Sequence, residues 1–459
     1  MDNTEANMEL YERAKDYALD YVRSVDARDV FPSDAAIAGL SAFVEELPDA
    51  GTDGLEILRL LHEHGSPATV AQTGGRYFGF VVGGALPVTV AARWLADVWD
   101  QNAGVYVMSP IAATLEDVCE KWLVELLGLP DGTAAGFVTG SSMATFCGLA
   151  AARNHLLAAQ GWDVAADGLF GAPPIRVVLS EEAHSTVFKA LSLLGLGGAR
   201  VETVPSDEQG RMDAAHLPAL DDATLLILQA GNVNTGAFDR FDLICERARA
   251  QGAWVHVDGA FGLLAAASRR FDDLTASMGL ADSWSTDAHK TLNVPYDSGI
   301  VFCRDRKALA AALGMQGTYI VYSDERDSMQ YTPEMSRRAR GVEVWAALKS
   351  LGRTGVASLV ETLHDQAKYF ADRLRANGFE VVNDVCFNQV NVRVGDEAET
   401  RRVAHAIQRS GVCWCGTSAR KGQPIIRISV CSHQTTRDDI DRSVAAFVQA
   451  RAGAQSPSA

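Results

Sequence analysis

Two residues that could do chemistry stand where two strand-like runs end. Asp258 closes the mostly apolar run 254–258, and Lys290 follows a later short run of the same kind. A lysine amine can hold an aldehyde cofactor as a Schiff base, and a buried aspartate can keep the nitrogen of a pyridine ring protonated. The pair therefore points to pyridoxal 5′-phosphate (PLP). A solvated lysine and an aspartate that caps a helix are the ordinary alternatives.

An anion site and a ring-holding residue precede this pair. The segment 136–145 runs from a strand through a glycine turn into a helix start, where free N–H groups, the helix dipole and the hydroxyls of Ser141 and Ser142 favour a phosphate. His184 follows the run 175–179, at a strand end where ligands of open α/β sheets bind, and its flat ring could stack on a pyridine. The ordinary alternatives are a serine helix cap and a surface histidine.

The elements that must position these residues form an α/β pattern. Between about residues 71 and 310, short apolar runs alternate with helical stretches, which indicates a mainly parallel sheet covered by helices on both faces. At 459 residues the chain is too long for a single core. We expect a helical N-terminal segment (1–70), a large domain that holds the chemistry (71–340) and a small C-terminal α+β domain (341–459).

Composition excludes several classes of protein. The net charge of −17 argues against nucleic acid or an anionic membrane as a partner, because both bind clustered lysine and arginine. The eight cysteines form no Cys-x-x-Cys pair, so we expect neither a disulfide framework nor a metal site. The N-terminus is acidic without an apolar core, and the uncharged stretch 132–152 is rich in Gly, Ser and Thr. We therefore expect a cytoplasmic protein without a membrane segment.

The order and the residue types of the motifs resemble those of the PLP-dependent group II amino-acid decarboxylases. This fold-type-I family includes the aromatic amino-acid and glutamate decarboxylases. The resemblance runs from about Thr73 to Ile440. Its strongest pieces are Asp287-Ala-His-Lys, His256-Val-Asp-Gly-Ala-Phe-Gly, Gly236-Ala-Phe-Asp, Ser336-Arg-Arg-Ala-Arg and Ile426-Arg-Ile-Ser-Val. A fold-type-I enzyme is therefore the expected architecture, and PLP is the expected cofactor.

The resemblance implies a role for each candidate in the large domain. Lys290 would bind the aldehyde of the cofactor, Asp258 would pair with its pyridine nitrogen, and His184 would stack over the ring. Ala260 would pack under the other face of the ring. The phosphate end would be bound by Ser141, Ser142 and His289. The implied reaction removes the α-carboxylate of an L-amino acid and gives the amine and CO₂.

Two residues are candidates for contact with the substrate. Arg427 stands in the segment where the family binds the substrate carboxylate, although a surface salt bridge is the alternative. Phe80 stands where the glutamate enzymes carry a polar residue. Because an apolar ring cannot recognise a side-chain carboxylate, we expect an aromatic or other apolar amino acid, unless Phe80 is plain core. The chain departs from the family at Asn232, which replaces a threonine and could still hydrogen-bond near the cofactor.

In this family a tyrosine on a mobile loop protonates the product carbon. The loop-like stretch 311–338 offers Tyr331, which we favour, and also Tyr319 and Tyr322. Oxidative deamination to an aldehyde, aldolase-type cleavage and transamination stay open on the same fold, as does a non-catalytic PLP-binding protein. The resemblance also implies a homodimer with the active site at the interface. We expect the loop 316–335 to reach into the neighbouring subunit's site.

Overall fold

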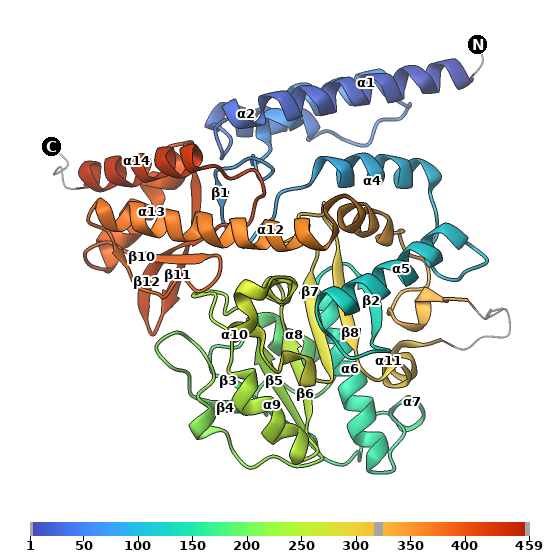
Figure 1. Cartoon of the computed structure of the whole chain (residues 1–459). Helices are drawn as coiled ribbons and strands as arrows, with labels where there is room; N and C mark the ends of the chain where they lie inside the picture. The colour runs from blue at the N-terminus through green and yellow to red at the C-terminus, as the bar shows by residue number, and fades with distance from the viewer. Residues whose placement is uncertain (1–2, 316–324, 455–459) are drawn as a thin grey trace. The chain divides into compact units, whose positions relative to one another are not determined.

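The computed structural model describes residues 3–315 and 325–454 (Figure 1). The chain divides into two compact units. Unit 1 comprises residues 1–82, 369–382 and 391–459, and unit 2 comprises residues 83–368 and 383–390. Tyr319 and Tyr322 lie outside the described residues.

A seven-stranded sheet forms the centre of unit 2, in the order β2-β8-β7-β6-β5-β3-β4. The pairs among β7, β6, β5, β3 and β4 are parallel, whereas β8 is antiparallel to both of its neighbours. Most strand residues are buried, as expected for a sheet covered on both faces, and the predicted mainly parallel α/β fold is confirmed. The strands are β2 (Ala134–Val138), β3 (Arg176–Ser180), β4 (Glu202–Val204), β5 (Thr224–Gln229), β6 (Trp254–Asp258), β7 (Ser283–Asp287) and β8 (Gly299–Cys303).

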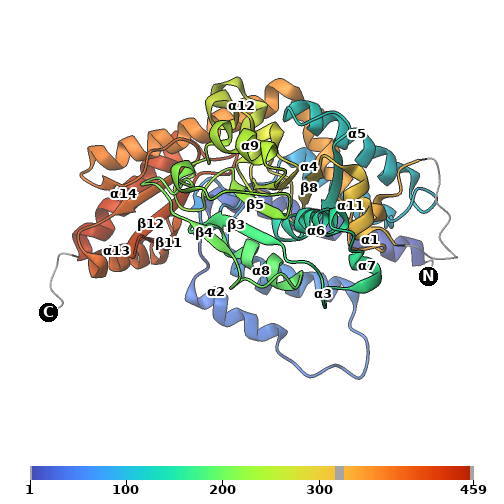
Figure 2. The same ribbon diagram turned by 90° about the horizontal axis from the view of Figure 1, so that it is seen from below.

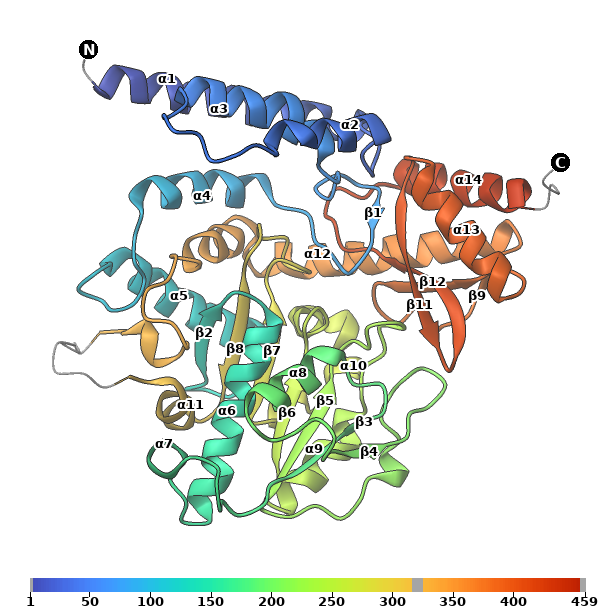
Figure 3. The same ribbon diagram turned by 180° about the vertical axis from the view of Figure 1, so that it is seen from behind.

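Helices cover both faces of this sheet. Helices α5 and α9 lie in front of the sheet in Figure 1, whereas α6 and α8 lie in front of it in the opposite view of Figure 3, and Figure 2 shows β5 between α9 and α8. No helix in the described ranges is long and apolar enough to span a membrane. The helices of unit 2 are α4 (Pro87–Trp99), α5 (Pro110–Leu126), α6 (Ser141–Ala159), α7 (Val164–Asp167), α8 (Ser185–Leu193), α9 (Phe241–Ala250), α10 (Asp272–Thr275) and α11 (Arg306–Leu313), with most of α12 (Gly341–Ala376), which kinks at Gly352.

Unit 1 is built on a five-stranded sheet in the order β1-β11-β12-β10-β9. The side chain of Ser33 caps α2 by accepting a hydrogen bond from the N–H of Ala36 (3.2 Å). The strands are β1 (Tyr77–Phe78), β9 (Glu380–Val381), β10 (Gln389–Arg393), β11 (Trp414–Arg420) and β12 (Gln423–Ser429). The helices are α1 (Asn3–Ser24), α2 (Asp34–Gly39), α3 (Gly54–Leu60), α13 (Glu397–Arg409) and α14 (Arg437–Ala454).

The boundaries between these units differ from the predicted ones. Residues 71–82 belong with the C-terminal sheet because β1 pairs with β11, and the guanidinium of Arg76 donates to the carbonyls of Asp26 (2.9 Å) and Arg28 (3.0 Å). The N-terminal helices are therefore part of unit 1 and not a separate segment. Residues 341–368 stay with the large unit.

A buried histidine of β6, His256, contacts two serines of β7 and packs against α6. Nδ1 of His256 lies 2.8 Å from Oγ of Ser283, and its Nε2 lies 3.4 Å from Oγ of Ser285. Gly148 of α6 lies against this histidine, and a Cβ atom there would lie 2.8 Å from the imidazole ring. Burial lowers the pKa of His256 to about 3, so the ring is neutral in the folded protein.

This histidine is expected to make the protein sensitive to acid. The unfolded chain binds a proton at His256 near pH 6.5, whereas the folded protein does so only near pH 3. The contribution of His256 to the free energy of unfolding is therefore fully present above pH 6.5. It falls by about 1.4 kcal/mol for each pH unit below that, down to about pH 3. Urea unfolding at pH 7 and pH 5 measures this loss, which H256Q is expected to lack. H216Q, at an exposed histidine, serves as the control. An equal pH dependence in H256Q and the wild type would contradict the prediction.

Candidate active site

Lys290 lies on the turn that follows β7, beside the carboxylate of Asp287. Its Nζ is 3.0 Å from Oδ2 of Asp287, and only 19% of the lysine side chain is exposed. The same carboxylate accepts hydrogen bonds from the N–H (2.5 Å) and the hydroxyl (2.7 Å) of Ser141, at the start of α6. Nε2 of His289 lies 3.4 Å from Oδ1 of Asp287. Asp287 thus brings together the lysine and two of the residues predicted to bind phosphate.

The start of α6 offers donors for an anion. The helix begins at Ser141, directly after Gly140. Strand β8 starts close to this turn: a Cβ atom at Gly299 would lie 2.3 Å from Cα of Gly140, so residue 299 must be glycine. The first N–H groups of a helix have no partner within the helix, and its dipole favours negative charge. Asp287 takes the N–H of Ser141, and Ser142 is exposed beside it. The N–H and the hydroxyl of Ser141 are therefore both engaged by a carboxylate of the protein itself.

His184 and Lys290 both lie within electrostatic reach of Asp258. Asp258 is buried, with 6% of the residue exposed, and its Oδ1 accepts the N–H of Ala260 (3.2 Å). Burial raises the pKa of the Asp258 carboxyl, and the charges of His184 and Lys290 oppose that rise. His184 caps α8, where its Nδ1 lies 2.8 Å from the hydroxyl of Thr186.

The topology explains why these residues meet. Strands β2, β3, β6 and β7 run in one direction, so their carboxyl ends share one edge of the sheet. Ligands of open α/β sheets bind at that edge. The residues that follow these ends are Ser141, Ser142, His184, Ala260, His289 and Lys290, and Asp258 is the last residue of β6. This donor set fits PLP, because it combines an amine, a buried carboxylate and a helix N-terminus.

Asn232 is a correction to the sequence prediction. Its Nδ2 donates to Oε2 of Glu182 (3.2 Å) and to the carbonyl of Gly210 (3.4 Å), and its Oδ1 accepts the N–H groups of Asn234 (2.9 Å) and Thr235 (3.2 Å). Protein groups therefore use both donor hydrogens and both lone pairs of the side-chain amide. Asn232 shapes its turn and does not offer its amide to a cofactor.

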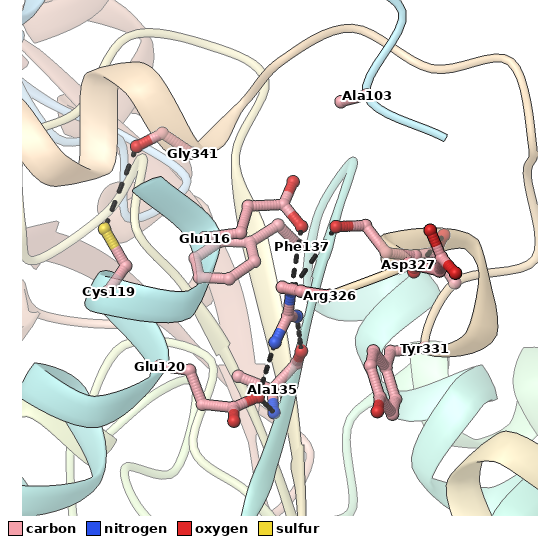
Figure 4. A network of polar contacts seen from close by, with 12 residues as sticks. Ala103, Glu116, Cys119, Glu120, Ala135, Phe137, Arg326, Asp327, Tyr331 and Gly341 are labelled. Atoms are coloured by element: carbon pink, nitrogen blue, oxygen red, sulfur yellow. Dashed lines mark hydrogen bonds and ion pairs between the residues drawn. The ribbon is translucent and has the colours of Figure 1, made fainter. Parts of the chain in front are cut away.

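The hydroxyl of Tyr331 is engaged within unit 2 and is not directed toward Lys290 of the same chain. The hydroxyl accepts a hydrogen bond from Arg306 (3.0 Å), and the guanidinium of Arg326 lies 4.9 Å from the ring centre. Figure 4 shows Arg326 between Glu116 and Glu120, with Tyr331 beside it.

The direction of β8 explains why Tyr331 and Lys290 of one chain are separated. Because β8 runs opposite to β7, the residues that follow it, Arg306 included, lie at the other edge of the sheet from Lys290. Tyr331 is a packed structural residue of unit 2 and does not present its hydroxyl to Lys290 of the same chain. The local sequence does not distinguish a packed tyrosine from one that acts in the active site.

Asp287 is a site residue for which the sequence predicted no role. The motif Asp287-Ala-His-Lys was visible, and a carboxylate three residues before a lysine is a signal for an ion pair. Its contacts with Ser141 join residues far apart in the chain, which spacing alone cannot reveal.

The two substrate candidates, Phe80 and Arg427, belong to unit 1. Phe80 is 65% exposed and stacks on Trp414 with 5.4 Å between ring centres, and Tyr77 stacks on the same indole at 5.3 Å. Arg427 lies opposite Gly416 in the β11–β12 pair. Burial lowers the pKa of Arg427 and raises the pKa of Tyr77 to about 12, and the guanidinium and the phenol act on each other.

Comparisons with known proteins agree with this geometry. Residues 71–394 match the family described as the pyridoxal-dependent decarboxylase conserved domain. An aromatic-L-amino-acid decarboxylase of Bacillus atrophaeus is 25% identical, over 93% of this chain and 92% of the relative, and the acidic amino acid decarboxylase GADL1 of Mus musculus is 26% identical, over 86% and 77%. The structure of Oryza sativa TDC with PLP and tryptamine has a TM-score of 0.90 at 21% identity, covering 98% of both chains. Mouse CSAD has a TM-score of 0.89 at 21% identity, covering 98% of this chain and 99% of that one.

Proposed function

The chain belongs to the pyridoxal-dependent decarboxylase family and is a PLP-dependent carboxy-lyase acting on amino acids, and we propose that its substrate is an aromatic or other apolar L-amino acid. The product would be the corresponding amine with CO₂. When bound, PLP supplies a ring that accepts the electrons released as the carboxylate leaves. The relatives act on both aromatic and acidic amino acids by their names, so the substrate class rests on this chain's own residues.

The site residues of unit 2 would divide the work. Lys290 would bind the aldehyde carbon and later take up or return a proton at its amine, while the buried Asp258 would hold a proton on the pyridine nitrogen. His184 would lie against the ring, and Ala260 is small enough to leave room under the other face. The phosphate would lie at the start of α6, bound by Ser141, Ser142 and His289.

The observation that carries the proposed substrate class is the exposed ring of Phe80. It lies on an indole in a stack of three aromatic rings that presents a flat apolar surface, to which aromatic side chains bind well. A side-chain carboxylate would lose hydration against that surface without gaining a partner. Arg427 is the residue we propose for the α-carboxylate, because a guanidinium can form two parallel hydrogen bonds with it.

We also propose that the protein forms a homodimer. Five apolar side chains on one face of α4 are between 41% and 69% exposed: Val88, Trp94, Leu95, Val98 and Trp99. An apolar face of this kind is unfavourable in water and is suited to a second copy. The sequence predicts that the loop 316–335 reaches the partner's site. Residues 316–324 lie outside the described part of the chain, and Arg326 and Tyr331 of this loop pack within unit 2. Sedimentation of L95D, compared with the wild type, tests the dimer, which the charge should weaken.

A substrate panel tests the proposed function. Purified holoenzyme is given aromatic, aliphatic and acidic L-amino acids while CO₂, amine, peroxide and ammonia are measured. We expect CO₂ with the matching amine, fastest for an aromatic or bulky apolar substrate. Preference for glutamate or aspartate would contradict the substrate class, and peroxide with ammonia would indicate oxidative deamination.

Phe80 provides a sharper test of the same proposal. F80A is expected to lower kcat/KM for an aromatic substrate by about 10- to 100-fold, because it removes apolar contact area, and to have a smaller effect on a small aliphatic substrate. F170A, which removes a side chain that is 99% exposed, is the matched control and should leave the ratio unchanged. Equal losses on both substrates in F80A would mean that the ring supports the fold and does not select the substrate.

A further inference from the structure

A buried asparagine binds the peptide group of Lys290. Asn293 has no exposed surface, and its Nδ2 donates to the main-chain carbonyls of Lys290 (3.1 Å) and Thr291 (3.2 Å). The main-chain N–H of Asn293 donates to the same lysine carbonyl (3.1 Å). Two donors from one residue therefore fix the carbonyl of Lys290.

The other side of Asn293 binds a segment that is distant in sequence. Its Oδ1 accepts the N–H of Gly84 (3.0 Å), and its carbonyl accepts the N–H of Leu86 (2.8 Å). At Gly83 a Cβ atom would lie 2.1 Å from the carbonyl oxygen of Lys290, so this segment touches the lysine turn directly. Residues 83–86 lead into α4, and Asn293 joins them to the turn that carries Lys290.

The backbone of Asn293 explains why asparagine suits this position. Its φ is +57°, in the left-handed region that asparagine and aspartate tolerate better than other residues with side chains. Glycine would also adopt this conformation but has no amide, and aspartate would lack the two N–H donors. Among the coded residues, asparagine combines this backbone with a short side chain that both donates and accepts.

We propose that Asn293 is a positioning residue that sets the orientation of Lys290. By fixing the lysine's carbonyl against residues 83–86, it limits the positions from which Nζ can approach Asp287 and a bound aldehyde. A misplacement of about 1 Å in a reacting group can cost on the order of 100-fold in rate. The inference rests on the proposed role of Lys290 as the residue that binds PLP.

Two variants separate the amide from the backbone. N293D keeps the volume, the left-handed backbone and the acceptor for Gly84, and it removes the donors to Lys290 and Thr291. N293G keeps the backbone conformation and removes the whole side chain. N383D is the matched control: Asn383 is also buried, and its Nδ2 donates to the carbonyls of Thr235 (3.0 Å) and Gln389 (3.0 Å), which are not part of the lysine turn.

The measurement is the capture of PLP by cofactor-free protein. The visible band is followed after mixing, the complex is reduced with borohydride, and the labelled peptide is identified by mass. Both N293D and N293G are expected to capture PLP about 10- to 100-fold more slowly than the wild type. N383D is expected to stay within about twofold, because its site is independent of the lysine. Amide exchange at Gly84 and Leu86 should quicken in N293G.

Each outcome decides the inference. Wild-type capture rates in N293D and N293G would overturn it, and so would a loss in N383D as large as in N293D, because that would indicate a general effect on folding. A normal rate in N293G with a slow N293D would mean that the introduced charge, and not the lost donors, acts on Lys290. If the wild type itself forms no lysine-linked product, the proposed function fails instead, and amide exchange at Gly84 still tests the contact with Asn293.

Discussion

Replacing Lys290 with alanine is expected to lower kcat/KM by roughly 10⁴-fold or more, because the variant lacks the amine that we propose binds the aldehyde of the cofactor and displaces the product after each turnover. The amine lies 3.0 Å from Asp287 and is largely shielded from solvent, so a free amine in solution cannot easily take its place. K290R should fail to the same extent, since a guanidinium keeps the charge but does not form the covalent link. Initial rates of CO₂ release measure the effect.

The control for this prediction is K307A, which removes an exposed lysine on α11, at the other edge of the sheet. K307A should keep both the activity and the visible band of bound PLP. In K290A the band of a lysine-linked cofactor should be absent, and borohydride should fix no PLP to the protein. An unchanged band in K290A would show that a different lysine binds the cofactor.

The site residues that the sequence predicted best are those whose position depends only on the strand that they end or follow. Asp258 and Lys290 each follow a run of buried residues, and parallel strands bring such ends to one edge whatever the rest of the chain does. His184 was located for the same reason, at the end of β3. Local pattern and sheet topology were therefore enough to predict that His184 and Lys290 both lie within electrostatic reach of Asp258.

The structure differs from the predictions where a side chain's partner comes from a distant segment. Tyr331 was chosen for its place on a loop, but Arg306 and Arg326 determine where its ring and hydroxyl lie. The boundary predicted at residue 70 differs from the division of the structure for a similar reason. Strand β1 has only two residues, too few for a visible period, and its partner β11 lies more than 300 residues later. Side-chain pairing over such separations is a property of the fold and leaves no periodic signal.

Replacing Asp258 with asparagine is expected to separate activity from stability. The amide has nearly the same shape and can still accept the N–H of Ala260, but it carries no charge to hold a proton on the pyridine nitrogen. Removing one partner of a buried charged pair costs about 3–5 kcal/mol, so kcat should fall by roughly 10² to 10⁴-fold. Because burial raises the pKa of Asp258, the charged carboxylate is unfavourable in the cofactor-free protein. Cofactor-free D258N should therefore melt at the same temperature as the wild type or higher.

The same substitution at a second buried aspartate, Asp239, is expected to have the opposite effects and serves as the control. Both oxygens of Asp239 accept main-chain N–H groups, from Met212 (2.7 Å) and Gln229 (2.7 Å). An amide there would turn its own N–H toward one of these donors, so D239N should lower the melting temperature, while the kcat of the folded fraction stays near that of the wild type. If Asp258 only supported the fold, D258N would behave like D239N, with a lower melting temperature and a nearly unchanged kcat. Loss of kcat with undiminished stability in D258N is the pattern that assigns its charge to the cofactor, because burial disfavours that charge in the empty site and a protonated pyridine nitrogen would require it.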